Sequence, residues 1–126
     1  FSDYLEDKVL DHVFGGTAYT APSTLYVGLY TAAPSDTGSG TEVTGGSYAR
    51  KSMSAMTVSG TTQATNGAAV EFVTATGSWG TVTHCGVFDA ASSGNLLGWA
   101  ALTASKTVAS GDVFRFDAGD LDITLA

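Results

Sequence analysis

The sequence predicts a mainly β protein, an antiparallel β-sandwich or barrel-like variant of about seven to nine short strands with one short N-terminal α-helix. Only the first fourteen residues have a helical period. From Thr17 onward, runs rich in Thr, Val, Tyr and Phe alternate with clusters of Gly, Ser, Asn and Asp. We therefore expect residues 1–16 to form an amphipathic helix packed on a single β domain, residues 17–126.

The composition restricts the class of protein. A chain of 126 residues with 44% hydrophobic residues can form one domain with its own core, and its single Cys cannot form an internal disulfide. Five basic against twelve acidic residues give a net charge of −7, which argues against nucleic acid or an anionic membrane as a partner. No apolar run is long enough to span a membrane, and the acidic N-terminal segment differs from a signal peptide. We expect a soluble protein made inside the cell.

The predicted helix runs from Asp3 to Phe14. Leu5, Val9 and Val13 recur at intervals of four and form an apolar stripe, which predicts that this face is buried. Ser2 is a suitable N-cap, and the following Gly15-Gly16 provides the stop.

The first half of the β domain contains the clearest strand. Residues 24–30 alternate strictly, with Leu25, Val27 and Leu29 on one face and Tyr26, Gly28 and Tyr30 on the other. The following segment, residues 33–40, is rich in Gly, Ser and Pro and is predicted to be an exposed contact loop. Further strands are predicted over residues 48–58 and 69–73.

The second half contains a predicted antiparallel hairpin. Residues 81–88 and 96–102 are apolar runs on either side of a Ser-Gly-Asn turn within residues 89–95. Short strands at 107–108, 113–116 and 121–125 complete the set.

Residues able to support catalysis are few. His84 and Cys85 are neighbours in a predicted strand, so their side chains point to opposite faces and do not form a nucleophile–base pair. Glu42, Glu71 and Asp89 are scattered carboxylates without the flanking Trp residues of a sugar-cleaving site. We expect no catalytic residues and no enzyme activity.

The sequence also contains no clear motif for binding a metal or a cofactor. The three acids of residues 117–122 lack the spacing of an EF-hand loop and are better explained by turn capping, as is Asp112. His12 is expected at the edge of the helix face. Trp79 and Trp99 adjoin glycines within apolar runs, which favours burial over a stacking platform. We expect no metal and no cofactor.

A resemblance covers nearly the whole chain. It rests on ordered motifs with the sequences FSDYLE (1–6), TLYVGLYTAAP (24–34), TEVTGGSYAR (41–50), GSWGTVTH (77–84) and GWAALTASKTV (98–108). This set resembles a family of small tailed-bacteriophage virion proteins commonly labelled "phage tail fibre protein". The resemblance implies a structural protein of the virion, made in the host bacterial cytoplasm, with no catalytic residues.

Three roles are compatible with the resemblance. A compact, weakly charged β domain without a repetitive shaft favours a capsid decoration or cement protein, bound as a homotrimer to the major capsid protein and stabilising the outer shell. The alternatives are a tail fibre or baseplate-associated protein with tail structural partners, and a glycan-binding attachment module.

Partner contacts are predicted on the helix, on the 33–40 loop and at aromatic residues of the strands. The aromatics are expected to be exposed, although core packing is the alternative for each. The predicted contact residues are Phe1, Tyr4, Leu5, Tyr26, Tyr30, Pro34, Asp36 and Tyr48.

Overall fold

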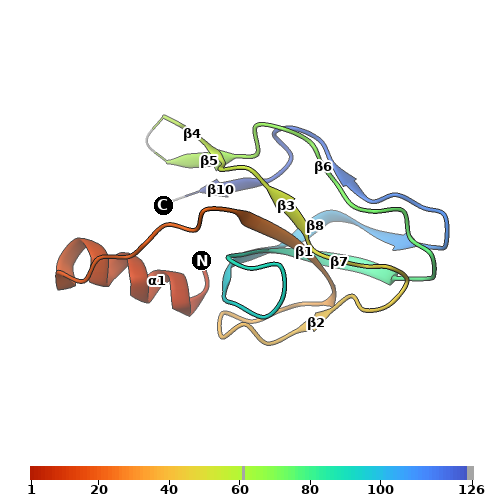
Figure 1. Ribbon diagram of the computed structural model, residues 1–126, viewed down its shortest axis with the longest axis horizontal. Helices are drawn as coiled ribbons and strands as arrows, with labels where there is room; N and C mark the ends of the chain where they lie inside the picture. The colour runs from red at the N-terminus through yellow and green to blue at the C-terminus, as the bar shows by residue number, and fades with distance from the viewer. Residues whose placement is uncertain (61, 125–126) are drawn as a thin grey trace.

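The computed structural model describes residues 1–60 and 62–124. Within them, an α-helix, α1 (Asp3–Leu10), continues into a π-helical turn, η1 (Asp11–Gly15), before ten strands (Figure 1). The strands are β1 (Leu25–Ala32), β2 (Thr41–Glu42), β3 (Lys51–Met53), β4 (Thr57–Ser59), β5 (Gln63–Thr65), β6 (Val70–Glu71), β7 (Gly80–Phe88), β8 (Leu96–Val108), β9 (Arg115–Phe116) and β10 (Asp122–Thr124).

The strands form three antiparallel sheets. The largest has the order β2-β1-β7-β8, with β3 also paired to β1, and the smaller ones are β10-β5-β4 and β6-β9. In Figure 1 the two small sheets lie above the large one. The predicted mainly β, antiparallel, sandwich-like fold is confirmed, and the sheets of the described residues do not close into a barrel.

Strand β1 is covered on both faces. Val27 and Leu29 are fully buried in the main core, as the alternation predicts. On the opposite face, Tyr30 belongs to a second cluster with Phe88 and Leu96. The expectation that Tyr30 is an exposed aromatic is therefore wrong: its side chain is only 3% exposed, because loops fold over this face of the sheet.

The main core lies between the large sheet and the two small sheets, and aromatic rings fill its centre. Phe72 makes edge-to-face contacts with Trp79 and Phe114, at centroid distances of 6.3 and 5.8 Å. The indole N–H of Trp79 donates a 2.9 Å hydrogen bond to the carbonyl of Gly46. The burial predicted for Trp79 is confirmed.

The hairpin of β7 and β8 is present as predicted, with antiparallel pairing on either side of the 89–95 loop. The separate strand expected at residues 107–108 is instead the end of β8. The register between β7 and β8 shifts after the Val82–Lys106 pair, so an irregularity within β8 explains why the sequence suggests a break there.

The single long strand predicted over residues 48–58 is wrong. The chain forms two three-residue strands there, because β3 pairs with β1 in the large sheet whereas β4 pairs with β5 in a small one. The other short strands are also shorter than predicted: only residues 70–71 of 69–73, 115–116 of 113–116 and 122–124 of 121–125 are strand. Residue 125 lies outside the described residues.

The helical segment begins as predicted but ends differently. The hydroxyl of Ser2 accepts a hydrogen bond from the N–H of Leu5, which confirms the N-cap, and Gly16 ends the segment with a φ of 75°. The last turn is π-helical rather than α-helical. No helix of the described residues is both long enough and apolar enough to cross a membrane.

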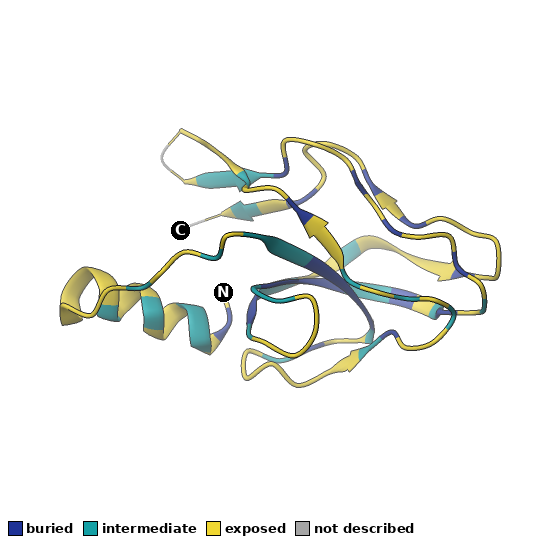
Figure 2. Cartoon of the chain, viewed as in Figure 1, coloured by how far each residue is buried: buried dark blue, intermediate teal, exposed yellow. Residues whose placement is uncertain are grey.

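The predicted burial of the helix stripe is wrong at Val13, which is 60% exposed, and no residue of α1 or η1 is buried. Only the beginning of the helix lies close to the sheet. Its remaining turns extend beyond the body of the domain, where no element of the described chain covers them (Figures 1 and 2).

Candidate functional site

The start of the helical segment is fixed to the β domain by main-chain hydrogen bonds. The N–H of Ser2 donates to the carbonyl of Leu97 at 2.9 Å, and its hydroxyl donates to the carbonyl of Leu96. The N–H of Asp3 donates to the carbonyl of Asp36 in the 33–40 loop at 3.0 Å. Because Ser2 is buried, its two bonds are shielded from water. Together with the bond of Asp3, they set the direction in which the helix leaves the domain.

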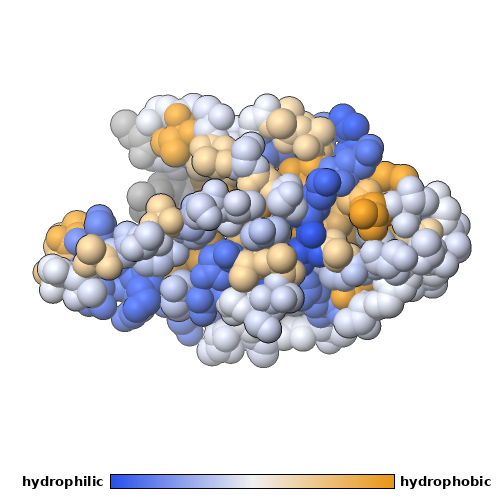
Figure 3. Space-filling model, viewed as in Figure 1, coloured by the Kyte–Doolittle hydropathy of each residue, from blue (hydrophilic) through white to orange (hydrophobic). Residues whose placement is uncertain are grey.

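The far end of the helical segment is apolar and exposed. We call this group the helix tip, and it consists of Val9, Leu10, Val13 and Phe14. Residues four positions apart lie on one side of a helix, so Val9 lies near Val13 and Leu10 near Phe14. Phe14 is 82% exposed, the highest value of any large hydrophobic residue described. Figure 3 shows hydrophobic atoms at this end of the molecule.

The segment that follows the helix holds the helix tip in place through two hydrogen bonds. The N–H of Thr17 donates to the carbonyl of Asp11 at 3.1 Å, and that of Tyr19 donates to Nδ1 of His12 at 3.0 Å. The helix tip is thus an ordered apolar surface. Such surfaces on proteins mark contacts with other molecules.

A second feature lies beside the helix start, where Arg50 connects three segments. Its guanidinium donates two hydrogen bonds of 2.9 Å to the carboxylate of Glu42. It also donates to the carbonyls of Ala90 and Ser93 in the 89–95 loop, and it lies 3.5 Å above the ring of Phe88. Arg50 thereby holds the 89–95 loop over the sheet.

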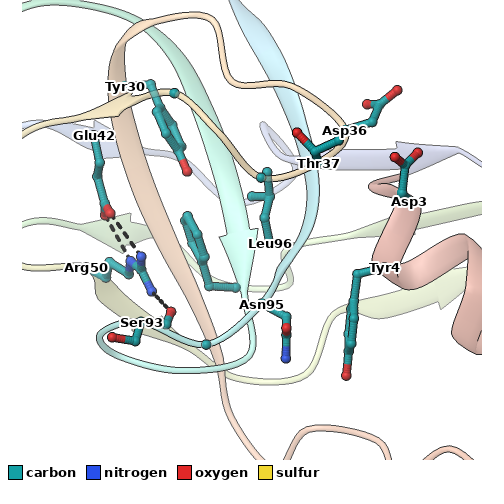
Figure 4. A pocket seen from close by; sticks show the side chains of 14 residues that line it. Asp3, Tyr4, Tyr30, Asp36, Thr37, Glu42, Arg50, Ser93, Asn95 and Leu96 are labelled. Atoms are coloured by element: carbon teal, nitrogen blue, oxygen red, sulfur yellow. Dashed lines mark hydrogen bonds and ion pairs between the residues drawn. The ribbon is translucent and has the colours of Figure 1, made fainter.

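This arrangement borders a cavity of about 560 Å³, which we call the loop-end pocket. The pocket is formed by the 33–40 loop, the 89–95 loop and the beginning of α1, and Figure 4 shows its side chains. The lining includes Asp3, Tyr4, Tyr30, Asp36, Thr37, Glu42, Arg50, Phe88, Asn95 and Leu96.

Burial changes the acid–base properties of two tyrosines near this pocket. It raises the pKa of Tyr30 to about 12, and the neighbouring Glu42 adds to the effect. It also raises the pKa of Tyr48 well above its usual value. The hydroxyl of Tyr48 donates to Glu42 at 2.7 Å and accepts from the N–H of Leu29 at 2.9 Å. Both hydroxyls therefore stay protonated to a higher pH than the hydroxyl of an exposed tyrosine.

The structure separates the predicted contact residues into several environments. Tyr4, Tyr30 and Asp36 line the loop-end pocket, whereas Phe1 and Leu5 line a groove of about 790 Å³ along β8.

Three further predicted contact residues are less accessible than expected. Pro34 is buried, which corrects its placement on an exposed contact loop. Tyr48 packs against the core aromatics, with its ring 5.3 Å from that of Trp79. Tyr26 is half-buried beside the second cluster.

The sequence reasoning did not select the helix tip or Arg50. The sequence shows the helix-tip residues as two apolar pairs, each spaced by four positions. This spacing is also typical of a helix face buried in the core, so it does not identify an exposed surface. Arg50 was part of the 41–50 motif, but nothing in the sequence indicated that its side chain bonds to Glu42 and to the 89–95 loop.

The other residues considered from the sequence have structural roles. Cys85 is buried, and burial raises the pKa of its thiol to about 11. The ring Nδ1 of His84 lies 2.8 Å from the hydroxyl of Thr83, within hydrogen-bond distance. Asp112 caps a turn by accepting from the N–H of Ala109, as expected. The indole of Trp99 donates to Asp36 at 3.0 Å.

Comparison with known proteins identifies the family. A family model described as podophage GP4 fiber I protein gp80 matches residues 1–124. The curated proteins contain no match to the chain. Because the model covers nearly all of the sequence, the chain belongs to the podophage GP4 fiber I protein gp80 family and is a structural protein of the phage virion.

Proposed function

We propose that this protein is a tail-fibre structural subunit that attaches to a neighbouring virion protein through its helix tip. The observation that carries the proposal is the exposed apolar surface of Val9, Leu10, Val13 and Phe14 on a helix whose start is fixed to the domain. The family description supports a position in the fibre. The proposed role involves no chemical turnover.

The expected strength of this attachment follows from its size. Burying one large apolar side chain contributes roughly 1.5–3 kcal/mol, so the four residues of the helix tip can provide several kcal/mol. Association of two proteins costs at least about 4 kcal/mol in lost freedom of motion. A single contact of this kind is therefore weak, and repeated copies in the particle would provide the avidity that a stable attachment needs.

The attachment is tested by replacing Val13 and Phe14 with Ser and assembling phage with the variant. We expect the double variant to fold but to be lost from purified virions. The matched control is Val58→Ser, because Val58 is also an exposed apolar residue, at 74%, but lies on β4. Equal incorporation of the helix-tip variant and the control, measured by mass spectrometry of virions, would contradict the proposal.

The copy number of the protein distinguishes the fibre from the capsid. A fibre subunit is expected in a small number of copies per particle, counted against the major capsid protein. A ratio near one copy per shell subunit would instead support the decoration role predicted from the sequence.

The predicted homotrimer is tested by light scattering of the purified protein. A trimer that persists in the Val13→Ser, Phe14→Ser variant would leave the helix tip free for another virion protein. A trimer that dissociates in this variant would assign the helix tip to self-association and contradict attachment to another protein.

A further inference from the structure

Strand β8 is an edge of the large sheet, and within the described residues no strand pairs with its outer side. Ala100 and Ala101 are both exposed, although neighbouring residues of a strand point to opposite faces. The middle of β8 is therefore open on both faces. Native proteins usually protect an open edge with charged residues, proline or a bulge. Residues 96–101 contain no charge and no proline, and the long irregularity of β8 begins only after Ala101.

The hydrogen bonds of β1 show which way the main-chain groups of the next strand point. The N–H of Leu29 donates to the hydroxyl of Tyr48, and the carbonyl of Leu29 accepts from the N–H of Val43. Both groups of Leu29 therefore point away from β7. Cys85 of β7 lies opposite Leu29, so the pair is not hydrogen-bonded and the main-chain groups of Cys85 point towards β8.

Four main-chain groups of β8 consequently face the open edge. Cys85 lies opposite Ala100, so these two residues exchange hydrogen bonds between β7 and β8. The N–H and C=O groups of the flanking Trp99 and Ala101 point the other way, out of the sheet. Within the described residues, no hydrogen bond reaches these four groups. Further along the same edge, the carbonyl of Leu97 is already occupied by the N-terminal segment.

A second copy of β8 provides the complementary groups. When two copies pair antiparallel around Ala100, Trp99 of each copy lies opposite Ala101 of the other. The N–H groups of these residues then donate to the carbonyls of the same residues in the other copy, so that every free group is paired. This register leaves the occupied carbonyl of Leu97 outside the paired segment.

The side chains fit the same register. Leu102 packs against the main core and lies opposite Gly98 of the other copy when Ala100 is at the centre. A Cβ atom at Gly98 would meet no atom within 4 Å, so the space beside this residue is open and can receive Leu102 of the copy.

The charges permit contact between two acidic copies at this edge. Each chain has a net charge of −7, but residues 96–105 contain no charged residue. Antiparallel pairing along this segment therefore places no like charges opposite each other. The groove of about 790 Å³ along β8 carries both signs, with Lys106 and Arg115 among its basic residues and Asp120 and Asp122 among its acidic ones.

We propose that two copies of this chain associate through the open edge of β8, so that their large sheets form one continuous antiparallel sheet. The contact is two-fold symmetric, because the same residues of each copy meet. It differs from the homotrimer predicted from the resemblance, and it uses a different surface from the helix tip. The dimer carries two helix tips, which strengthens attachment to a neighbouring protein through avidity.

The first experiment is light scattering of the purified full chain over a dilution series. We expect a dimer that dissociates on dilution. Ala100→Lys places two ammonium groups opposite each other and should give a monomer at concentrations where the unmodified chain is a dimer. Ser105→Lys is the matched control, because it adds the same charge at an exposed position of β8 outside the paired segment. It should remain a dimer.

The second experiment tests the register with Ala100→Cys. A residue at the centre of the pairing lies opposite its own copy at a Cα distance of about 4.5 Å, which permits a disulfide. Mild oxidation should therefore produce a covalent dimer of Ala100→Cys, whereas Ser105→Cys should stay largely uncrosslinked. Cys85 is buried and is common to both variants.

Three results would overturn the proposal. The first is an unmodified chain that stays monomeric throughout the series, which would leave the edge to a strand of another virion protein. The second is the same mass for Ala100→Lys and Ser105→Lys, or equal cross-linking of the two Cys variants. The third is a dimer that dissociates in the Val13→Ser, Phe14→Ser variant, which would assign self-association to the helix tip instead of β8.

Discussion

At the scale of single residues, the contacts of Arg50 hold together β2, the segment before β3 and the 89–95 loop. The side chains of Arg50 and Glu42 are only 9% and 24% exposed, and their bidentate pair joins β2 to the segment before β3. Removing one member of a buried ion pair is costly, because the other charge remains without its partner. The exposed pair of Arg115 and Glu71, by contrast, is expected to contribute little.

We predict that Glu42→Gln lowers the free energy of unfolding by about 2–4 kcal/mol, since it removes the charge that balances Arg50. The measurement is urea denaturation at neutral pH. Glu71→Gln is the matched control, with an expected change below about 0.5 kcal/mol. Equal effects of the two substitutions would show that the Arg50–Glu42 pair does not stabilise the fold.

The buried tyrosine hydroxyls predict a loss of stability at alkaline pH. The pKa of Tyr30 rises from 10.0 in the unfolded chain to about 12 in the folded protein. The unfolded state therefore loses its proton first, and the free energy of unfolding falls as pH increases from about 10 to about 12. Denaturation midpoints at several pH values should show this fall and a shallower one in Tyr30→Phe. An identical slope in both proteins would contradict the assignment.

At the scale of elements, glycines determine how the loops approach the core. Gly45 and Gly46 are neighbours, with φ angles of 77° and 56°. A Cβ atom at Gly45 would meet no atom within 4 Å, whereas one at Gly46 would lie 2.8 Å from the carbonyl oxygen of Gly77 and 2.9 Å from Trp79. Gly46 thus allows its loop to pack directly against Trp79.

This difference predicts unequal effects of two neighbouring substitutions. Gly45→Ala should cost about 1–2 kcal/mol, because Ala is strained at a positive φ. Gly46→Ala should cost about 1–3 kcal/mol more, because the added methyl group also collides with backbone and ring atoms. Thermal and urea unfolding of both variants provide the comparison. A cost at Gly46 no larger than that at Gly45 would mean that the loop can move away from Trp79.

At the scale of the whole molecule, the core and the helix tip are energetically separate. Phe72 is 2% exposed at the centre of the aromatic cluster, whereas Phe14 is 82% exposed and lies outside both hydrophobic clusters of the described residues. The fold therefore gains little free energy from the helix tip, which leaves that surface available for partner contacts.

We predict that Val13→Ser with Phe14→Ser changes the free energy of unfolding by less than about 0.5 kcal/mol, as is usual for exposed positions. Phe72→Ala should lower it by about 3–5 kcal/mol. Chemical denaturation of the purified proteins measures both. A large loss in the helix-tip variant would show that the tip packs within the protein and would remove the basis of the proposed attachment.

The sequence by itself determined the elements with strong local signals. Ser2 caps the helix, residues 25–30 of the predicted 24–30 lie in a strand, and the Ser-Gly-Asn turn joins a hairpin, because each depends on neighbours in the chain. Local patterns also predicted the antiparallel sandwich, whereas the family was indicated by the resemblance of the ordered motifs.

Only the tertiary structure decided which apolar groups are buried. Tyr30 and Phe14 both occupy periodic apolar positions, yet loops cover the first while the second extends beyond the sheet. The pairing of Arg50 with Glu42 and the closure of the loop-end pocket likewise join segments from different parts of the chain. A periodic pattern shows which side chains share a face, but burial of that face depends on which distant segments pack against it.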